Sequence, residues 1–403
     1  MSAPSGLVPL RVIDLAGREG AYCARLLADL GADVVKVEPP GGDPVRSLPP
    51  FVADRPDADG SVWWLALNAN KRSIVCDLAS TEGRELFLRL IARADVLVES
   101  FAPGHLDGLG LDDLTLWSWN DRLIHTSITP YGPAGPLATT PASDLEVTAM
   151  SGALWLAGEP DGRPVRTTLP QSGYWAGMYA AAGTLVAALA RPDGGGGGQR
   201  VDVSSQASMA TVHAPAPLWW DLAGEDHGRT GPFLLGRSIV GARFRNVWRC
   251  QDGYVSFALQ GGPIGRHTGR MLTQWMAARG EAVAEVAAID WDAWDPRTLT
   301  SAEVARLEGA IAPFFLGLTK AEFFAGSVER NMLGYPVSTA EDIAADAQLA
   351  VRGFWQELAR PDGPSLRFPG GFALFDGERP GLRRAAPRLG EHDAEIRGET
   401  GPA

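Results

Sequence analysis

The sequence predicts an α/β fold, in which helices cover a mostly parallel sheet, followed by a second and smaller α+β domain. Two observations carry this prediction. Over roughly the first half of the chain, short β-branched runs alternate with segments whose apolar residues recur at helical spacing. Beyond about residue 236 that alternation stops. Strands separated by helices require crossover connections, which produce a parallel sheet, and 403 residues are enough for two domains.

The N-terminal elements follow in order. Short apolar runs predict strands at 10–16, 32–40, 71–78, 95–100 and 123–129. Helical spacing predicts helices at 20–31 and 80–94. The second helix has acids in its first turn and arginines later, as the helix dipole favours. These elements make up the strand–helix alternation of an α/β domain.

From Asp144 the pattern becomes helical, with helices expected at 144–158 and 174–190. The glycine run at 194–198 is interpreted as a flexible connection to a strand at 200–205, because it does not lead into a helix that would hold a phosphate. The segment from about 211 to 236, rich in Pro, Gly and Trp, is expected to be a linker.

The second domain begins with a predicted hairpin over 247–259, with Asp252-Gly253 at its turn. Helices are expected near 265–279, 301–316 and 319–330, and the tail is expected to return to short strands. The predicted division is therefore 1–210, then 211–334 for the linker and small domain, then 335–403.

Composition excludes several classes of protein. A net charge of −12 argues against a nucleic-acid surface. No run approaches the roughly 18 apolar residues of a membrane helix, and no secretory signal is visible. Three distant cysteines and six scattered histidines predict neither disulfides nor a metal site. We expect a cytoplasmic protein without membrane or nucleic-acid partners.

Common catalytic motifs are missing. The loop "LAGREGAY" after the first strand lacks the G-x-G-x-x-G spacing of dinucleotide-binding proteins, which disfavours a dehydrogenase. There is no P-loop and no G-x-S-x-G. Asp144 follows "TTPAS" at the start of a predicted helix, so a role as the cap of that helix is one interpretation.

Several further blocks stand out in the sequence. They are "LLADLGADVVKVEPPGGDPVRS", "NANKRSIVCDL", "ADVLVESFAPG", "DRLIHTSITPYGPAGP" and "GGGQRVDVS", with "MLGYPVSTAEDIAADAQLAVRGFW" near the end. Together they resemble the class III CoA-transferases, the carnitine- and formyl-CoA-transferase family. The resemblance implies a Rossmann-like large domain formed by both chain ends, a smaller domain between them, and an interlocked dimer. It also implies coenzyme A and acyl-CoA as substrates, with no covalently bound cofactor.

The family's transferases use an aspartate that attacks the acyl-CoA carbonyl. Aligning "DGRPVRTTLPQSGYWAGMYAA" with the family's nucleophile segment places Gly173 at the aspartate position, so the resemblance implies that this nucleophile is absent. The related racemases need the same aspartate and a histidine where this chain has Ser143. Proton abstraction next to a thioester is therefore not supported either.

The resemblance also implies a groove for coenzyme A. Its expected residues are Arg18, Cys76, Ser100 and Phe101. Bulky side chains near the pocket suggest an aromatic or long branched acid as substrate, and these are Trp155, Tyr174 and Trp175. Basic residues that some members place against the phosphates of coenzyme A are replaced, at Pro39, Gly108 and Pro141.

Three hypotheses remain open at this stage. The chain is the non-catalytic subunit of a benzylsuccinate-type CoA-transferase, paired with a homologous catalytic subunit in a heterodimer or heterotetramer. Alternatively, it is a self-sufficient homodimeric transferase that uses another carboxylate, with Asp144 as the candidate. In the third, it binds acyl-CoA without turnover. Loss of a covalent nucleophile costs on the order of 10⁴–10⁶ in rate, which favours the first hypothesis.

Overall fold

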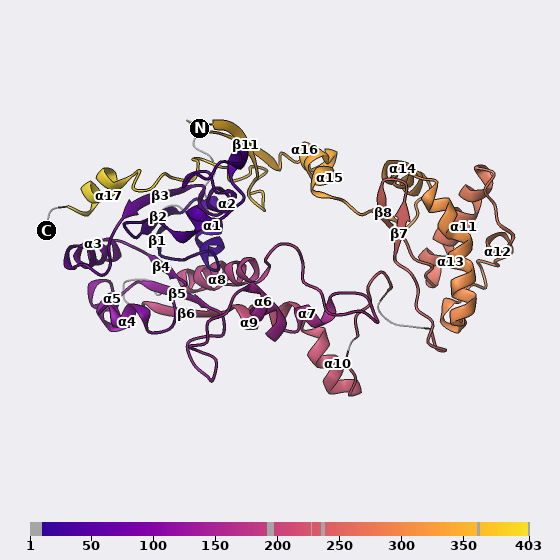
Figure 1. Ribbon diagram of the computed structural model, residues 1–403, viewed down its shortest axis with the longest axis horizontal. Helices are drawn as coiled ribbons and strands as arrows, with labels where there is room; N and C mark the ends of the chain where they lie inside the picture. Colours follow the sequence, from indigo (N-terminus) through magenta and orange to yellow (C-terminus); the bar gives the residue numbers. More distant parts are fainter. Residues whose placement is uncertain (1–9, 192–196, 227, 235–237, 361–362, 402–403) are drawn as a thin grey trace. The chain divides into compact units, whose positions relative to one another are not determined.

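The computed structural model describes residues 10–191, 197–226, 228–234, 238–360 and 363–401 (Figure 1). The chain forms two compact units. The larger consists of Met1–Leu154, Arg166–His227 and Ala347–Ala403, and the smaller of Trp155–Val165 and Gly228–Asp346. The chain therefore passes between the units four times, and one of these passages falls just before the segment that contains Gly173.

The larger unit is built on a six-stranded sheet of order β3-β2-β1-β4-β5-β6, in which all the paired strands run parallel. Its strands are β1 (Arg11–Asp14), β2 (Asp33–Glu38), β3 (Lys71–Val75), β4 (Val96–Glu99), β5 (Ile124–Thr129) and β6 (Gln199–Ser204). This order is that of a doubly wound Rossmann-like sheet, which confirms the predicted α/β class. The central strands are buried on both faces, and this explains their near-continuous apolar runs.

Helices cover both faces of this sheet. Helices α1 (Ala21–Asp29) and α8 (Ser172–Leu189) pack against one face in a single apolar cluster. Helices α3 (Thr81–Ile91) and α5 (Asp113–Trp119) cover the other face, where the C-terminal helix α17 (Asp393–Thr400) contributes Ile396. The strand order reverses between β1 and β4, the position at which open α/β sheets bind ligands.

Shorter elements complete the larger unit. They are α2 (Val62–Asn68), α4 (His105–Gly108), α6 (Asp144–Met150), α7 (Ala153–Leu156, whose second half belongs to the smaller unit), α9 (Ser205–Val212), α10 (Pro215–Ala223), α16 (Ala347–Val351) and the hairpin of β10 (Trp355–Arg360) and β11 (Gly363–Pro369). Three single-turn 3-10 helices lie at Pro44–Ser47 and Val52–Asp54 in this unit and at Pro296–Thr298 in the smaller one.

The smaller unit combines an antiparallel sheet with helices around an aromatic core. Its strands are β7 (Val247–Cys250), β8 (Gly253–Ser256) and β9 (Tyr335–Pro336), and its helices are α11 (Gly262–Ala278), α12 (Ala284–Ala287), α13 (Ser301–Leu316), α14 (Lys320–Glu329) and α15 (Ala340–Ala345). Trp248, Trp275, Phe257 and Phe315 are among the residues of its apolar cluster. These tryptophans are packing residues.

The predicted hairpin exists, but Cys250 pairs with Gly253, so Gln251 and Asp252 form its turn. The expected linker is wrong in part, because Pro215–Ala223 is helical. Proline stands in the first turn and Gly224, at φ +66°, ends the helix. The glycine run at 194–198 lies largely outside the described residues.

The third segment of the larger unit begins at Ala347 in the structure. Our predicted boundary at 335 differs because β9 pairs with β8 of the smaller unit. In the described part of the chain no single helix has the length and apolarity to cross a membrane, although α13 and α14, bent by 110°, meet that test as a pair.

Candidate functional site

A pocket lies beside the loop that follows β1, near the switch point of the sheet, and α2 and the N-terminus of α8 also line it. The Gly17 amide donates a hydrogen bond of 2.9 Å to Ser100 Oγ, which ties this loop to the loop that follows β4. The N-terminus of α8 lies against the loop that follows β1, where Gly173 faces the Glu19 backbone. Two expected coenzyme A residues, Arg18 and Ser100, are therefore brought to the same edge of the sheet.

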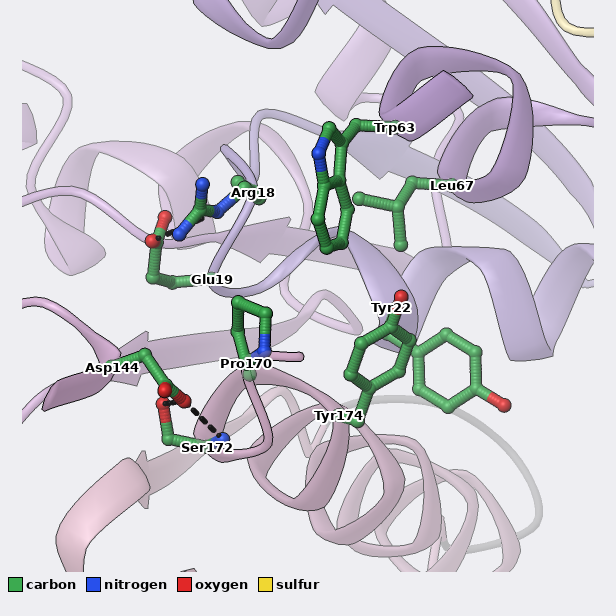
Figure 2. Close-up of a pocket in the computed structure, with 10 residues that line it drawn as sticks. Arg18, Glu19, Tyr22, Trp63, Leu67, Asp144, Pro170, Ser172 and Tyr174 are labelled. Atoms are coloured by element: carbon green, nitrogen blue, oxygen red, sulfur yellow. Dashed lines mark hydrogen bonds and ion pairs between the residues drawn. The ribbon is translucent and has the colours of Figure 1, made fainter. Parts of the chain in front are cut away.

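The pocket has a polar side and an apolar side (Figure 2). The residues that line it are Arg18, Glu19, Tyr22, Trp63, Leu67, Asp144, Pro170, Ser172, Gly173 and Tyr174. Figure 2 shows Arg18, Glu19, Asp144 and Ser172 on one side, with Trp63, Leu67 and the tyrosines on the other. Such a pocket suits a ligand that carries both polar and apolar groups.

Several side chains that line the pocket contact one another and hold each other in place. The Arg18 guanidinium lies 5.5 Å from the centre of the Trp63 ring and 3.4 Å from the Glu19 carboxylate. The rings of Tyr22 and Tyr174 meet edge to face at 4.9 Å. Sequence analysis missed α2, which supplies Trp63 and Leu67, because the "SVWWLALN" segment is only two turns long.

Gly173 stands in the first turn of α8, against the loop that carries Glu19. A Cβ atom at position 173 would lie 2.9 Å from the Glu19 carbonyl oxygen and 3.2 Å from its Cα. One turn further, a Cβ at Gly177 would lie 2.9 Å from the Cys23 amide nitrogen. Glycines four residues apart thus let α8 approach α1 and its preceding loop closely, and the backbone has taken the space of a side chain at 173.

Asp144 is buried and binds the N-terminus of α8. Its Oδ1 accepts three hydrogen bonds, from the Gln171 amide at 2.7 Å, the Ser172 amide at 2.8 Å and the Ser172 hydroxyl at 2.9 Å. The expectation that Asp144 caps its own helix is wrong, because Ser143 occupies that position in a capping box with Glu146. Asp144 instead caps a helix that begins 28 residues later.

The other expected residues are more dispersed. Cys76 is buried in the apolar cluster beneath α3, where its Sγ donates to the Gly83 carbonyl, and burial raises its pKa to about 11. Phe101 stacks on His105 with ring centres 4.4 Å apart. Trp155 belongs to the smaller unit, where Arg229 lies 4.7 Å from its ring centre.

Fully buried charges support the β1–α1 loop, and sequence analysis missed them. Lys71 Nζ lies 2.8 Å from Asp14 Oδ2, and neither side chain is exposed. Lys36 Nζ donates to the Ala16 carbonyl at 2.6 Å and pairs with Asp43 at 2.8 Å. The sequence feature that could have predicted these buried charges is the presence of charged residues inside or next to apolar strands, in "VIDL", "VVKVE" and "NKRS".

The two lysines respond differently to this environment. Burial lowers the pKa of Lys71 more than its partner Asp14 raises it. Burial also opposes the charge of Lys36, but Asp14, Asp43 and Glu38 outweigh it and raise the pKa of that ammonium. Among the residues described, no group of three His, Cys, Asp or Glu side chains could hold a metal ion.

The doubly wound sheet and the pocket near its switch point define a Rossmann-like ligand-binding protein. The chain matches the model of CoA-transferase family III over residues 7–393, and it belongs to that family. It is therefore the chain of a CoA-transferase, a class of enzyme whose substrates are CoA thioesters.

Individual relatives agree with this assignment. The chain is 38% identical to the subunit BbsE of succinyl-CoA:(R)-benzylsuccinate CoA-transferase from Thauera aromatica, over 97% of this chain and 93% of the relative. It is 32% identical to succinate–glutarate CoA-transferase of Agrobacterium fabrum, over 97% and 94% of the two chains. A CAIB/BAIF family structure from Brucella suis superposes with a TM-score of 0.83 at 30% identity, covering 98% and 100%.

Proposed function

We propose that this chain is the non-catalytic subunit of a heteromeric class III CoA-transferase, and that a homologous subunit supplies the nucleophilic aspartate. The observation that carries the proposal is Gly173. This residue has no side chain, and a Cβ at this position would lie only 2.9 Å from the Glu19 carbonyl oxygen. The similarity to BbsE, which is itself a subunit, supports the same conclusion.

The chemistry that family membership implies is the transfer of CoA from one acid to another through covalent intermediates on a carboxylate. A carboxylate of the partner attacks the thioester carbonyl, the C–S bond breaks, and CoA leaves as the thiolate. The thiolate then attacks the aspartyl carbonyl of the anhydride, which forms an aspartyl-CoA thioester and releases the first acid. The acceptor carboxylate attacks this thioester and expels CoA thiolate, which gives a second anhydride. The thiolate finally attacks the acceptor's acyl carbon, so that the new acyl-CoA forms and the aspartate carboxylate is freed. Anhydride and thioester are both activated acyl groups, so each step is close to reversible.

Asp144 is a poor substitute for that nucleophile. Three hydrogen bonds to Oδ1 stabilise the Asp144 carboxylate in its present position, and Asp144 is only 7% exposed. An attack on a thioester through Oδ2 would turn Oδ1 into a neutral carbonyl oxygen, and would therefore weaken the three hydrogen bonds that hold the first turn of α8. The geometry therefore favours the partner-subunit function over a self-sufficient enzyme.

We also propose that the acids transferred are aromatic or branched, and that the enzyme is cytoplasmic. Trp63, Tyr22 and Tyr174 give the pocket an aromatic side, and the name of the Thauera relative includes (R)-benzylsuccinate. The three cysteines are free and buried, as expected in a reducing compartment.

The test compares the chain alone with the chain co-expressed with a homologue that keeps the aspartate. We expect CoA exchange between succinyl-CoA and benzylsuccinate only in the complex. Hydroxylamine trapping followed by peptide mapping should label the homologue alone. Rapid exchange by the isolated chain, with a label on its own Asp144, would contradict the proposal.

A matched pair of variants tests the position itself. Gly173→Asp and Gly173→Ala place the same Cβ against Glu19, so both are expected to destabilise the fold by about 1–3 kcal/mol. Neither should give the isolated chain exchange activity. Chemical denaturation measures the stability. A Gly173→Asp variant that is as stable as the parent and has exchange activity would contradict the proposal, because the loop that carries Glu19 would then have moved aside for the new side chain.

A further inference from the structure

The connection between the smaller unit and α8 is fixed at both ends by side chains. On the smaller-unit side, Arg229 donates hydrogen bonds to the carbonyls of Glu159 and Gly162 at 3.2 and 2.7 Å. On the larger-unit side, Asp144 binds Gln171 and Ser172. Residues 166–169, between the two, are all exposed.

From these contacts we propose that Asp144 is a positioning residue, which fixes the first turn of α8 at the point where the chain returns from the smaller unit. These hydrogen bonds from Gln171 and Ser172 to Asp144, here called the clamp, close the segment 145–170, of which 155–165 belong to the smaller unit. The pocket residues Ser172, Gly173 and Tyr174, which follow directly, are thereby held in place within the larger unit. This inference rests on the proposed function only in giving that pocket a role in a CoA-transferase.

Three features show that the clamp serves α8. First, α6 has its own cap at Ser143 and Glu146, so Asp144 is not needed to start that helix. Second, Gln171, the N-cap residue of α8, makes no side-chain capping bond. Without Asp144, the Gln171 and Ser172 amides would lose their shared acceptor in a buried position, which is unfavourable.

The third feature is the chemistry of the acceptor. A carboxylate at a helix N-terminus is stabilised by the helix dipole, and α8 has no acidic residue of its own in the first turn. All three bonds use one oxygen, Oδ1, as acceptor. An asparagine at 144 keeps such an oxygen, so it should retain the clamp, whereas it would abolish a carboxylate nucleophile.

Amide hydrogen exchange of the whole chain, without ligand or partner, tests the proposal. Asp144→Ala is expected to speed exchange of peptides covering 171–177 by roughly tenfold, as loss of a helix cap does. Asp144→Asn should stay within about twofold of the parent, because it retains the acceptor. Glu146→Ala is the matched control in the same helix, and it should loosen the start of α6 but leave 171–177 unchanged.

Unchanged exchange at 171–177 in Asp144→Ala would overturn the proposal, and so would equal damage by Asn and Ala. If Asp144→Ala does not fold, the Asn variant and Ser172→Ala, which removes a single donor, still give a graded result. These measurements require no turnover. Failure of the clamp is therefore distinguishable from failure of the partner-subunit function, which the exchange of CoA measures.

Discussion

Both units of this chain have apolar clusters at their centres, but the larger unit also buries charged side chains. The smaller unit buries a cluster of tryptophans and phenylalanines, with the rings of Phe257 and Phe315 5.2 Å apart. The larger unit buries Asp14 at the carboxyl end of β1, Lys36 within β2 and Lys71 at the start of β3. Buried ion pairs are seldom the most stable way to fill a core. Their place beneath the β1–α1 loop indicates that they maintain the geometry of the pocket.

The largest effect should come from breaking a buried pair. Lys71→Met leaves the Asp14 carboxylate buried without its ammonium, which is expected to cost about 3–5 kcal/mol in the free energy of unfolding. Urea denaturation measures it. The double variant Lys71→Met with Asp14→Leu is the control, since it should recover much of the loss. A single variant within about 1 kcal/mol of the parent would remove the contrast between the units.

A partly exposed cluster of the larger unit should show a smaller effect that depends on pH. Burial opposes the charge of Asp113, but hydrogen bonds from His125 and Arg200 outweigh it and lower its pKa to about 2. Because the folded pKa lies below the unfolded value, the contribution is present above about pH 4 and disappears as the pH falls through about 2.

Asp113→Asn should therefore be less stable than the parent by about 1–2 kcal/mol at neutral pH, and the two should converge as the medium is acidified toward pH 2. Urea titrations at a series of pH values measure this. If the free energies of unfolding of the parent and of Asp113→Asn differed by the same amount at every pH, the charge of the Asp113 carboxylate would contribute nothing to stability.

The smallest effect is expected in the smaller unit. Phe257→Leu keeps an apolar side chain of similar bulk and leaves no charge unpaired, so it should cost about 1 kcal/mol or slightly more. The same urea assay compares it with Lys71→Met. A loss as large as that of the lysine variant would show that the aromatic core tolerates change no better than the buried charges.

The sequence by itself determined the class of fold and most elements of the sheet. Periodicity is a local property, so the runs at β1 to β6 and the helices between them were predictable from neighbouring residues. The family blocks also led to the prediction that Gly173 takes the place of the nucleophile, because alignment needs only residue order. The same alignment named Arg18 and Ser100 as coenzyme A residues; the structure brings both to one edge of the sheet, and their binding role stays a prediction.

Only the tertiary structure decided how these residues are used. It showed that the Glu19 backbone fills the space beside Gly173, that Asp144 caps α8 and not α6, and that Cys76 is a core residue. Each of these depends on contacts between segments far apart in the chain. Hydrogen bonds and close packing across such separations leave no periodic pattern in the sequence, since they are set by where the folded backbone brings the atoms.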